Sequence, residues 1–120
     1  MQRIIVEVGS KDTKIDICYG KESEHILTIP IEFEEDYKKE NKLNKEDVDK
    51  LIERVNILNV VYDDIHIYGT GLFRELNEEE KNEFLKEFKE KTGREFNILD
   101  DEEEKGLHEK GVEYLANRNN

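Results

Sequence analysis

The run of β-branched residues at 2–8 constrains the fold of this chain more than any other segment. Its apolar residues, Ile4, Ile5, Val6 and Val8, are nearly continuous, which is typical of a strand buried on both faces. A turn at 9–12 follows, and residues 13–19 then alternate between apolar and polar. A second turn leads to an apolar segment at 24–29, which ends at Pro30, the only proline. Three strands joined by two short turns predict an antiparallel meander.

The rest of the chain predicts helices that alternate with strands. Residues 31–43 are charged and lack a clear period, so we expect a loop there. Asn44 is a suitable N-cap for a helix that follows it. The later elements are a strand at 64–69, a helix at 78–92, a strand at 95–99 and a helix from Asp100 or Asp101 to about 117. The order βββαβαβα resembles the α/β ribonuclease H-like (actin-like ATPase) fold, with a five-stranded mixed sheet and three helices.

Net charge restricts the partners that one domain of 120 residues can have. Charged residues make up 42% of the chain, and the formal net charge is −12. Duplex nucleic acid and anionic membranes both require a cationic face, so we expect neither as a direct partner. A basic protein partner is compatible with this charge. A lone cysteine, Cys18, excludes an internal disulfide, and no apolar run suits a signal peptide or membrane span, which favours the cytoplasm.

A candidate phosphate loop follows the first strand. Glu7 places a carboxylate near the strand end, and Gly9, Ser10 and Lys11 then form a turn with backbone N–H groups and a hydroxyl. Such a turn can cradle phosphate oxygens. An ordinary hairpin turn accounts for the same residues, so spacing alone leaves both interpretations open.

Two later strand ends carry further polar candidates. Thr70 lies in a glycine loop that precedes Arg74, a natural partner for phosphate, although a βα loop with a surface arginine has the same pattern. The acidic run 100–104 starts a helix, where each exposed carboxylate gains about 0.3–1 kcal/mol from the helix dipole alone. One of these acids could still act as a base, because α/β sites gather at the carboxyl ends of strands. The strand at 64–69 ends without an acid, which argues against a metal-dependent nuclease.

Taken together, these loops resemble the N-terminal half of the exopolyphosphatase/guanosine pentaphosphate phosphatase family. The matching segments run in the family's order and are Val8-Gly9-Ser10, Gly69-Thr70 with Arg74, and residues 82–85, 91–99, 103–104 and 111–112. The resemblance implies that residues 1–120 form a single ribonuclease H-like domain, similar to the first lobe of a two-lobed phosphatase.

The resemblance also implies roles for individual residues. Glu104 matches a catalytic base that activates water against a terminal phosphoanhydride. Phosphate-binding roles fall on Gly9, Ser10, Lys11, Thr70 and Arg74, and Glu7 matches a metal ligand. The implied cofactor is Mg²⁺, and the implied substrate is polyphosphate or a guanosine polyphosphate.

Several positions depart from the family pattern. Glu7 replaces an aspartate, Lys11-Asp12 replaces a polar pair, and Asp12 places a negative charge where phosphate should bind. Asp101 stands where the family has a glycine, and Lys105 replaces a small residue. The second lobe, with its own phosphate loop, has no counterpart in this sequence.

The missing lobe leaves three interpretations open. The chain is a fragment of a longer enzyme, or it forms a homodimer that recreates a two-lobed cleft, or it is a relic that binds a partner. The missing lobe and the altered phosphate loop favour the first or the third. The function we expect is that of a phosphoanhydride-binding lobe that is catalytically incomplete alone. The alternative function is a small acidic protein-binding module, or an inhibitor that occupies a basic groove on a nucleic-acid enzyme.

Overall fold

Five strands form one mixed sheet in the part of the chain that the computed structural model describes, residues 2–20 and 22–110, with side chains to residue 106. The strands are β1 (Gln2–Val8), β2 (Asp12–Tyr19), β3 (Glu22–Pro30), β4 (Ile65–Gly69) and β5 (Phe96–Ile98). Their spatial order is β3-β2-β1-β4-β5. β2 pairs antiparallel with β1 and β3, whereas β4 runs parallel to β1 and β5. The predicted meander and the predicted mixed sheet are therefore confirmed.

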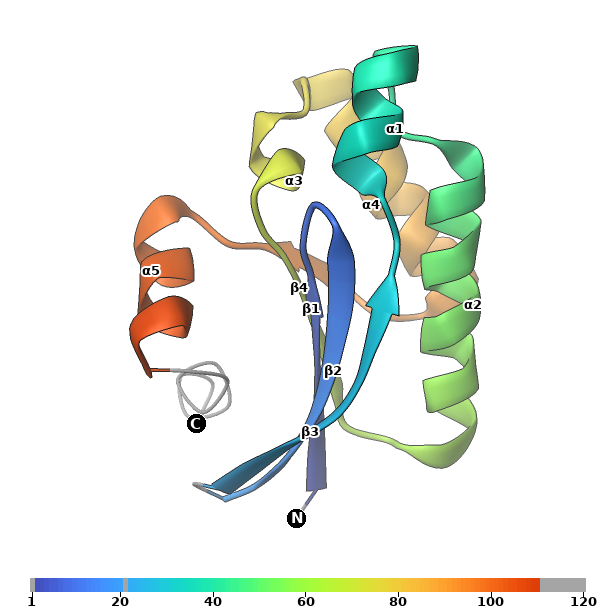
Figure 1. Cartoon of the computed structure of the whole chain (residues 1–120). Helices are drawn as coiled ribbons and strands as arrows, with labels where there is room; N and C mark the ends of the chain where they lie inside the picture. Colours follow the sequence, from blue (N-terminus) through green and yellow to red (C-terminus); the bar gives the residue numbers. More distant parts are fainter. Residues whose placement is uncertain (1, 21, 111–120) are drawn as a thin grey trace.

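Helices cover the sheet unequally. The described helices are α1 (Phe33–Glu40), α2 (Lys45–Val61), α3 (Leu72–Glu75), α4 (Glu78–Thr92) and α5 (Asp101–Lys110). Figure 1 shows α1, α2 and α4 to one side of the sheet and α5 on the other. The predicted N-cap of α2 is confirmed, since Asn44 accepts a hydrogen bond from the Asp47 N–H at 3.0 Å. Gly93 ends α4 with a φ of 72°. The part of the last helix predicted beyond residue 110 lies outside the described residues.

Two segments predicted as loops are helical, which gives five described helices in place of three. Residues 31–43 contain α1, which has a single fully buried side chain, Phe33. That one anchor leaves no apolar period to detect, and ion pairs between residues four apart, such as Glu34 with Lys38, support the helix on its exposed side. The loop around Arg74 likewise contains the single helical turn α3. β3 also begins two residues earlier than predicted and includes Pro30, which an edge strand tolerates.

An aromatic cluster joins the helices to the sheet. Phe73 packs within 5.3 Å, centroid to centroid, of Phe33, Phe84 and Phe96. Gly69 makes this packing possible, because a Cβ there would overlap the ring of Phe96. This glycine of the strand-end loop therefore serves the core, and the cluster holds α3 and β5 against the end of β4.

Asp47 is a buried carboxyl where α2 begins near α1. Asp47 is only 4% exposed, and its Oδ2 has no hydrogen-bond partner. Burial raises the pKa of Asp47 to about 6, with further increases from a hydrogen bond to the Asp36 carboxyl and from the charge of Asp36. We therefore expect the stability of the α1–α2 junction to depend on pH.

Candidate functional site at the carboxyl ends of the parallel strands

Three segments far apart in the sequence meet where β1, β4 and β5 end. The backbone N–H of Leu72 lies 3.4 Å from the Ser10 hydroxyl, which joins the β4–α3 loop to the β1–β2 turn. The N–H of Gly71 donates to Glu104 Oε1 at 3.1 Å, which joins the same loop to α5. The predicted loops around Gly9, Thr70 and Glu104 thus lie at one edge of the sheet, the usual position of sites in α/β folds.

Arg74 is the central charged group of this arrangement. Its Nη1 donates to Glu104 Oε1 at 2.9 Å and lies 3.4 Å from the Leu99 carbonyl oxygen, while its Nη2 lies 3.1 Å from Asp101 Oδ1. The Arg74 and Glu104 side chains are 25% and 23% exposed, whereas Asp101 is 94% exposed. The pair with Asp101 is therefore weak and easily exchanged, and the pair with Glu104 is better shielded from water.

The backbone conformation of the β4–α3 loop requires a glycine at position 71. Its φ is 56°, in the region that favours glycine, and a Cβ at this position would lie 2.7 Å from the Ser10 Oγ. The close approach of the loop to Ser10 therefore depends on the absence of a side chain. The same geometry leaves the Gly71 N–H directed at the Glu104 carboxylate.

The remaining predicted phosphate ligands are less available, because they are buried or their backbone groups already form hydrogen bonds. The N–H of Gly9 donates to the Asp12 carbonyl at 2.9 Å, so it closes the hairpin turn. Thr70 is 7% exposed, and its hydroxyl lies 3.5 Å from the Val8 carbonyl. The exposed Lys11 contributes its carbonyl to the Ile31 N–H at 3.2 Å. The Gly9 N–H and the Lys11 carbonyl are therefore already engaged, as they can be in an ordinary hairpin.

Glu7, the predicted metal ligand, lies half-buried and in register with Tyr68 of β4. Alternation along β1 directs it to the sheet face opposite Val6 and Val8. Among the described residues, no group of three or more His, Cys, Asp or Glu side chains is placed to hold a metal ion. The described residues therefore do not form a complete Mg²⁺ site.

A groove of about 410 Å³ opens beside the Ser10–Gly71 contact. It is lined by Ser10, Glu34, Tyr37, Lys38, Gly71, Leu72 and Glu75. The wall formed by α1 was missed in the sequence, because residues 31–43 were predicted to be a loop. The available signal was the spacing of Glu34 and Lys38, which form an ion pair at 3.1 Å.

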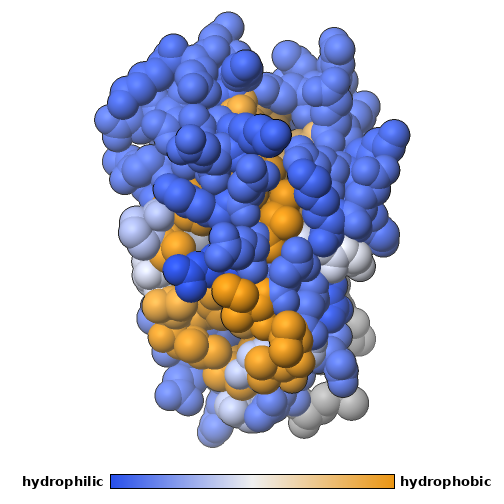
Figure 2. All heavy atoms as spheres, turned by 90° about the vertical axis from the view of Figure 1, so that its right-hand side faces the viewer, coloured by the Kyte–Doolittle hydropathy of each residue, from blue (hydrophilic) through white to orange (hydrophobic). Residues whose placement is uncertain are grey.

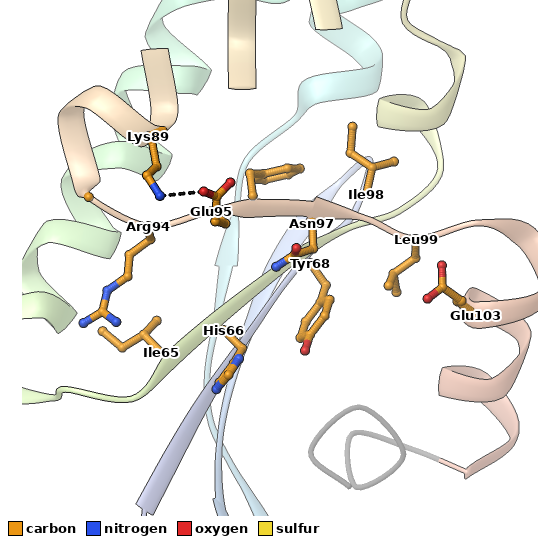
Figure 3. A pocket seen from close by; sticks show the side chains of 12 residues that line it. Ile65, His66, Tyr68, Lys89, Arg94, Glu95, Asn97, Ile98, Leu99 and Glu103 are labelled. Carbon is orange, nitrogen blue, oxygen red and sulfur yellow. Dashed lines mark hydrogen bonds and ion pairs between the residues drawn. The ribbon is translucent and has the colours of Figure 1, made fainter. Parts of the chain in front are cut away.

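A larger groove, of about 740 Å³, runs along the β5 edge and contains none of the predicted site residues. Figure 3 shows His66 and Tyr68 from β4 and Asn97 from β5 at its centre, with Arg94 at one end and Glu103 at the other. Arg94 is held structurally, since its Nε donates to Asn59 Oδ1 at 2.8 Å and its Nη1 to the Asp63 carbonyl at 2.9 Å. Volume alone therefore does not identify the candidate site.

The sheet order and the position of the helices define a ribonuclease H-like, actin-like fold, as predicted. The sequence matches no protein-family model and no curated protein. Similar solved structures include an Aquifex aeolicus Ppx/GppA phosphatase, with a TM-score of 0.65 and 17% identity over 82% of this chain. An exopolyphosphatase from Cytophaga hutchinsonii has a TM-score of 0.66 and 10% identity over 83% of this chain.

A more distant neighbour is the ethanolamine utilization protein EutJ from Carboxydothermus hydrogenoformans, with a TM-score of 0.55 and 14% identity over 94% of this chain. The two phosphatases are neighbours that the resemblance to exopolyphosphatases predicts, and at such identities all three structures establish the fold. This chain covers 35% and 34% of the two phosphatase chains, so it spans about a third of their length. No helix within residues 2–20 and 22–110 is long and apolar enough to cross a membrane.

Proposed function

We propose that this chain is a phosphoanhydride-binding lobe of the exopolyphosphatase/guanosine pentaphosphatase kind, and that it is catalytically incomplete alone. The observation that carries the proposal is the convergence of Arg74, Glu104 and the Gly71 N–H at the carboxyl ends of the parallel strands. These groups combine a cation for phosphate, a carboxylate for a base and a backbone donor. Phosphoanhydride hydrolysis requires this lobe to bind the anion and to accept a proton.

Arg74 is the phosphate-binding group in this proposal. Its Nη2 gives up the exposed Asp101 carboxylate when a phosphate arrives, since a divalent oxyanion competes well with a solvent-exposed partner. The Ser10 hydroxyl and the groove beside it accommodate further phosphates of a chain. Thr70 acts by positioning the loop, because its N–H donates to the Val8 carbonyl at 3.1 Å.

Glu104 is the general base in this proposal. Both of its contacts to Gly71 and Arg74 use Oε1, which fixes the carboxylate and makes Oε2 the atom proposed to accept a proton from the attacking water. Oε2 accepts a proton from that water as the new P–O bond forms, and the anhydride P–O bond breaks with its electron pair on the leaving phosphate. The second lobe of the family closes this site from the other side, so we expect the isolated chain to bind without efficient turnover.

The test is calorimetric titration of the protein with inorganic tripolyphosphate. Replacing Arg74 with Gln should weaken binding by about tenfold or more, because a charge-assisted contact is lost. Arg54→Gln is the matched control, since Arg54 is an exposed arginine on α2 outside the site. Glu104→Gln should retain binding, because the amide removes a negative charge that competes for Arg74.

The outcomes separate the two halves of the proposal. Equal affinities for Arg74→Gln and Arg54→Gln would show that the anion is bound by general charge, which contradicts the site. Phosphate release from tripolyphosphate at an enzymatic rate by the monomeric chain would contradict catalytic incompleteness. If release occurs and Glu104→Gln leaves it unchanged, Glu104 is not the base.

A further inference from the structure

A cluster of exposed apolar side chains lies away from the candidate site, where α2 ends beside the β2–β3 edge. We call it the apolar patch, and its members are Tyr19, Leu27, Ile57, Val60 and Val61, with exposures of 44%, 43%, 52%, 86% and 70%. Figure 2 shows apolar atoms gathered in the lower half of the face on which α2 lies. Large contiguous apolar surface of this kind marks interaction sites in proteins that are otherwise strongly polar.

Strand register places the two strand residues of the patch on the face that carries α2. Leu27 lies opposite Ile15, and residues directly opposite each other in an antiparallel pair share a face. Tyr19 lies two residues beyond Ile17 on β2, so it shares the same face. Ile15 and Ile17 belong to the core beneath the helices. The core surface of the sheet therefore continues past the last helix and reaches solvent at Leu27 and Tyr19.

The end of α2 lies over the same end of the sheet. The connection after α2 is fastened to β1 by a hydrogen bond from the Ile4 N–H to the Asp64 carbonyl at 2.9 Å, and Ile4 pairs with Ile17. α2 buries Val48, Leu51, Ile52 and Val55, yet its last turns also expose Ile57, Val60 and Val61. The helix thus has a second apolar flank in addition to the stripe that faces the core.

The patch has the shape of a seat for one more helix. A helix packed on the α2 flank would lie about 8–10 Å from the α2 axis, at the end of the domain where Leu27 and Tyr19 are also exposed. Strand addition fits less well, because the pairing of β3 with β2 shifts register between Ile15 and Asp16 of β2, and β3 ends at Pro30. Bulges and prolines are common protections of an edge strand against pairing.

Charge identifies the kind of helix that fits. Along the chain, the exposed charged residues nearest the patch are the acids Glu22, Glu24, Glu53 and Asp63 and the cation Arg54, whereas the exposed cations Lys45 and Lys50 lie nearer the start of α2. The chain carries a net charge of −12, so a second copy is repelled, whereas a basic partner is attracted. We propose that the apolar patch binds a basic amphipathic helix from another protein. This inference is independent of the phosphate site.

The test is an NMR titration of the ¹⁵N-labelled protein with a synthetic Leu/Lys amphipathic peptide about four turns long, in about 0.15 M NaCl to limit general charge effects. Amide shifts should concentrate at Tyr19, Leu27 and the last two turns of α2. The double variant Val60→Ser, Val61→Ser should weaken binding by about tenfold or more. Both side chains are largely exposed, so the variant should fold normally, and it keeps every charge.

Three outcomes would overturn the proposal. Shifts scattered over the acidic starts of α4 and α5, or equal affinities for the wild type and the double variant, would show attraction by charge alone. Equal binding of a Leu/Glu peptide would show that the acidic rim selects nothing. A dimer in sedimentation equilibrium that the double variant abolishes would make a second copy the occupant.

Discussion

Replacing Asp47 with Asn should stabilise this protein at neutral pH and remove part of its pH dependence. The pKa of the Asp47 carboxyl is raised from 3.8 to about 6, chiefly by burial and then by Asp36. Because the folded state holds the proton more tightly than the unfolded state, the contribution of Asp47 to stability is greatest below pH 3.8. It declines as the pH rises through about 6 and stays at its lower value above that.

The shift sets the size of the expected effect. A rise from 3.8 to about 6 corresponds to roughly 3 kcal/mol, at about 1.4 kcal/mol per pKa unit. Asparagine gives up about 0.3–1 kcal/mol of helix-dipole stabilisation, since Asp47 lies in the first turn of α2. Its amide can donate a hydrogen bond to the Asp36 carboxylate in place of the shared proton. We therefore expect Asp47→Asn to be about 2 kcal/mol more stable than the wild type at pH 7.5.

Urea unfolding at a series of pH values from about 4 to 8 measures this effect directly. Asp49→Asn is the matched control, because Asp49 is an exposed acid on the same helix and loses no buried charge. The free energies of wild type and Asp47→Asn should diverge as the pH rises, while those of wild type and Asp49→Asn should run parallel. Parallel curves for all three proteins, or a loss of stability in Asp47→Asn at pH 7.5, would refute the reasoning.

Three further substitutions test the packing and the loops. Phe73→Ala should lower the free energy of unfolding by about 3–5 kcal/mol in urea, because the ring is 0% exposed in the aromatic cluster. Gly71→Ala should lower the free energy of unfolding by about 1–3 kcal/mol, since a Cβ would approach the Ser10 Oγ. Gly20→Ala is the control and should lower it less, because a Cβ there meets open space at a similar φ. Equal losses in the two variants would contradict the contact with Ser10. Asn77→Ala should lower the free energy of unfolding by about 1 kcal/mol, because Asn77 Oδ1 accepts a hydrogen bond from the Glu80 N–H at 2.8 Å. Amide exchange at the start of α4 should become faster, and unchanged exchange there would argue against the cap.

Local signals explain which elements were predictable. The β-branched run at 2–8 and the alternation at 13–19 gave β1 and β2 with boundaries within a residue. The 78–92 helix was predicted at its observed length, because its cap residue and Gly93 are encoded at its own ends. α1 was missed because its stability depends on Phe33 meeting Phe73, a residue forty positions away.

The candidate site was predictable in its members but not in its arrangement. Strand ends with glycine, arginine and acidic residues indicated Arg74 and the acidic run 100–104, and the resemblance to exopolyphosphatases singled out Glu104 and assigned the roles. The link from Gly71 to Glu104 and the second partner of Arg74, Asp101, came only with the structure. Their catalytic and phosphate-binding roles remain predictions for the titrations described above.

The amino-acid sequence by itself determined the strands, the capped helices, the acidic surface and the fold class, because each follows from spacing or composition within a short segment. Tertiary structure alone decided that the Asp36 and Asp47 carboxyls share a contact and that apolar residues from β2, β3 and α2 meet at one surface. The physical reason is distance along the chain. Burial and charge pairing depend on neighbours that only the folded sheet brings together, and no local period encodes them.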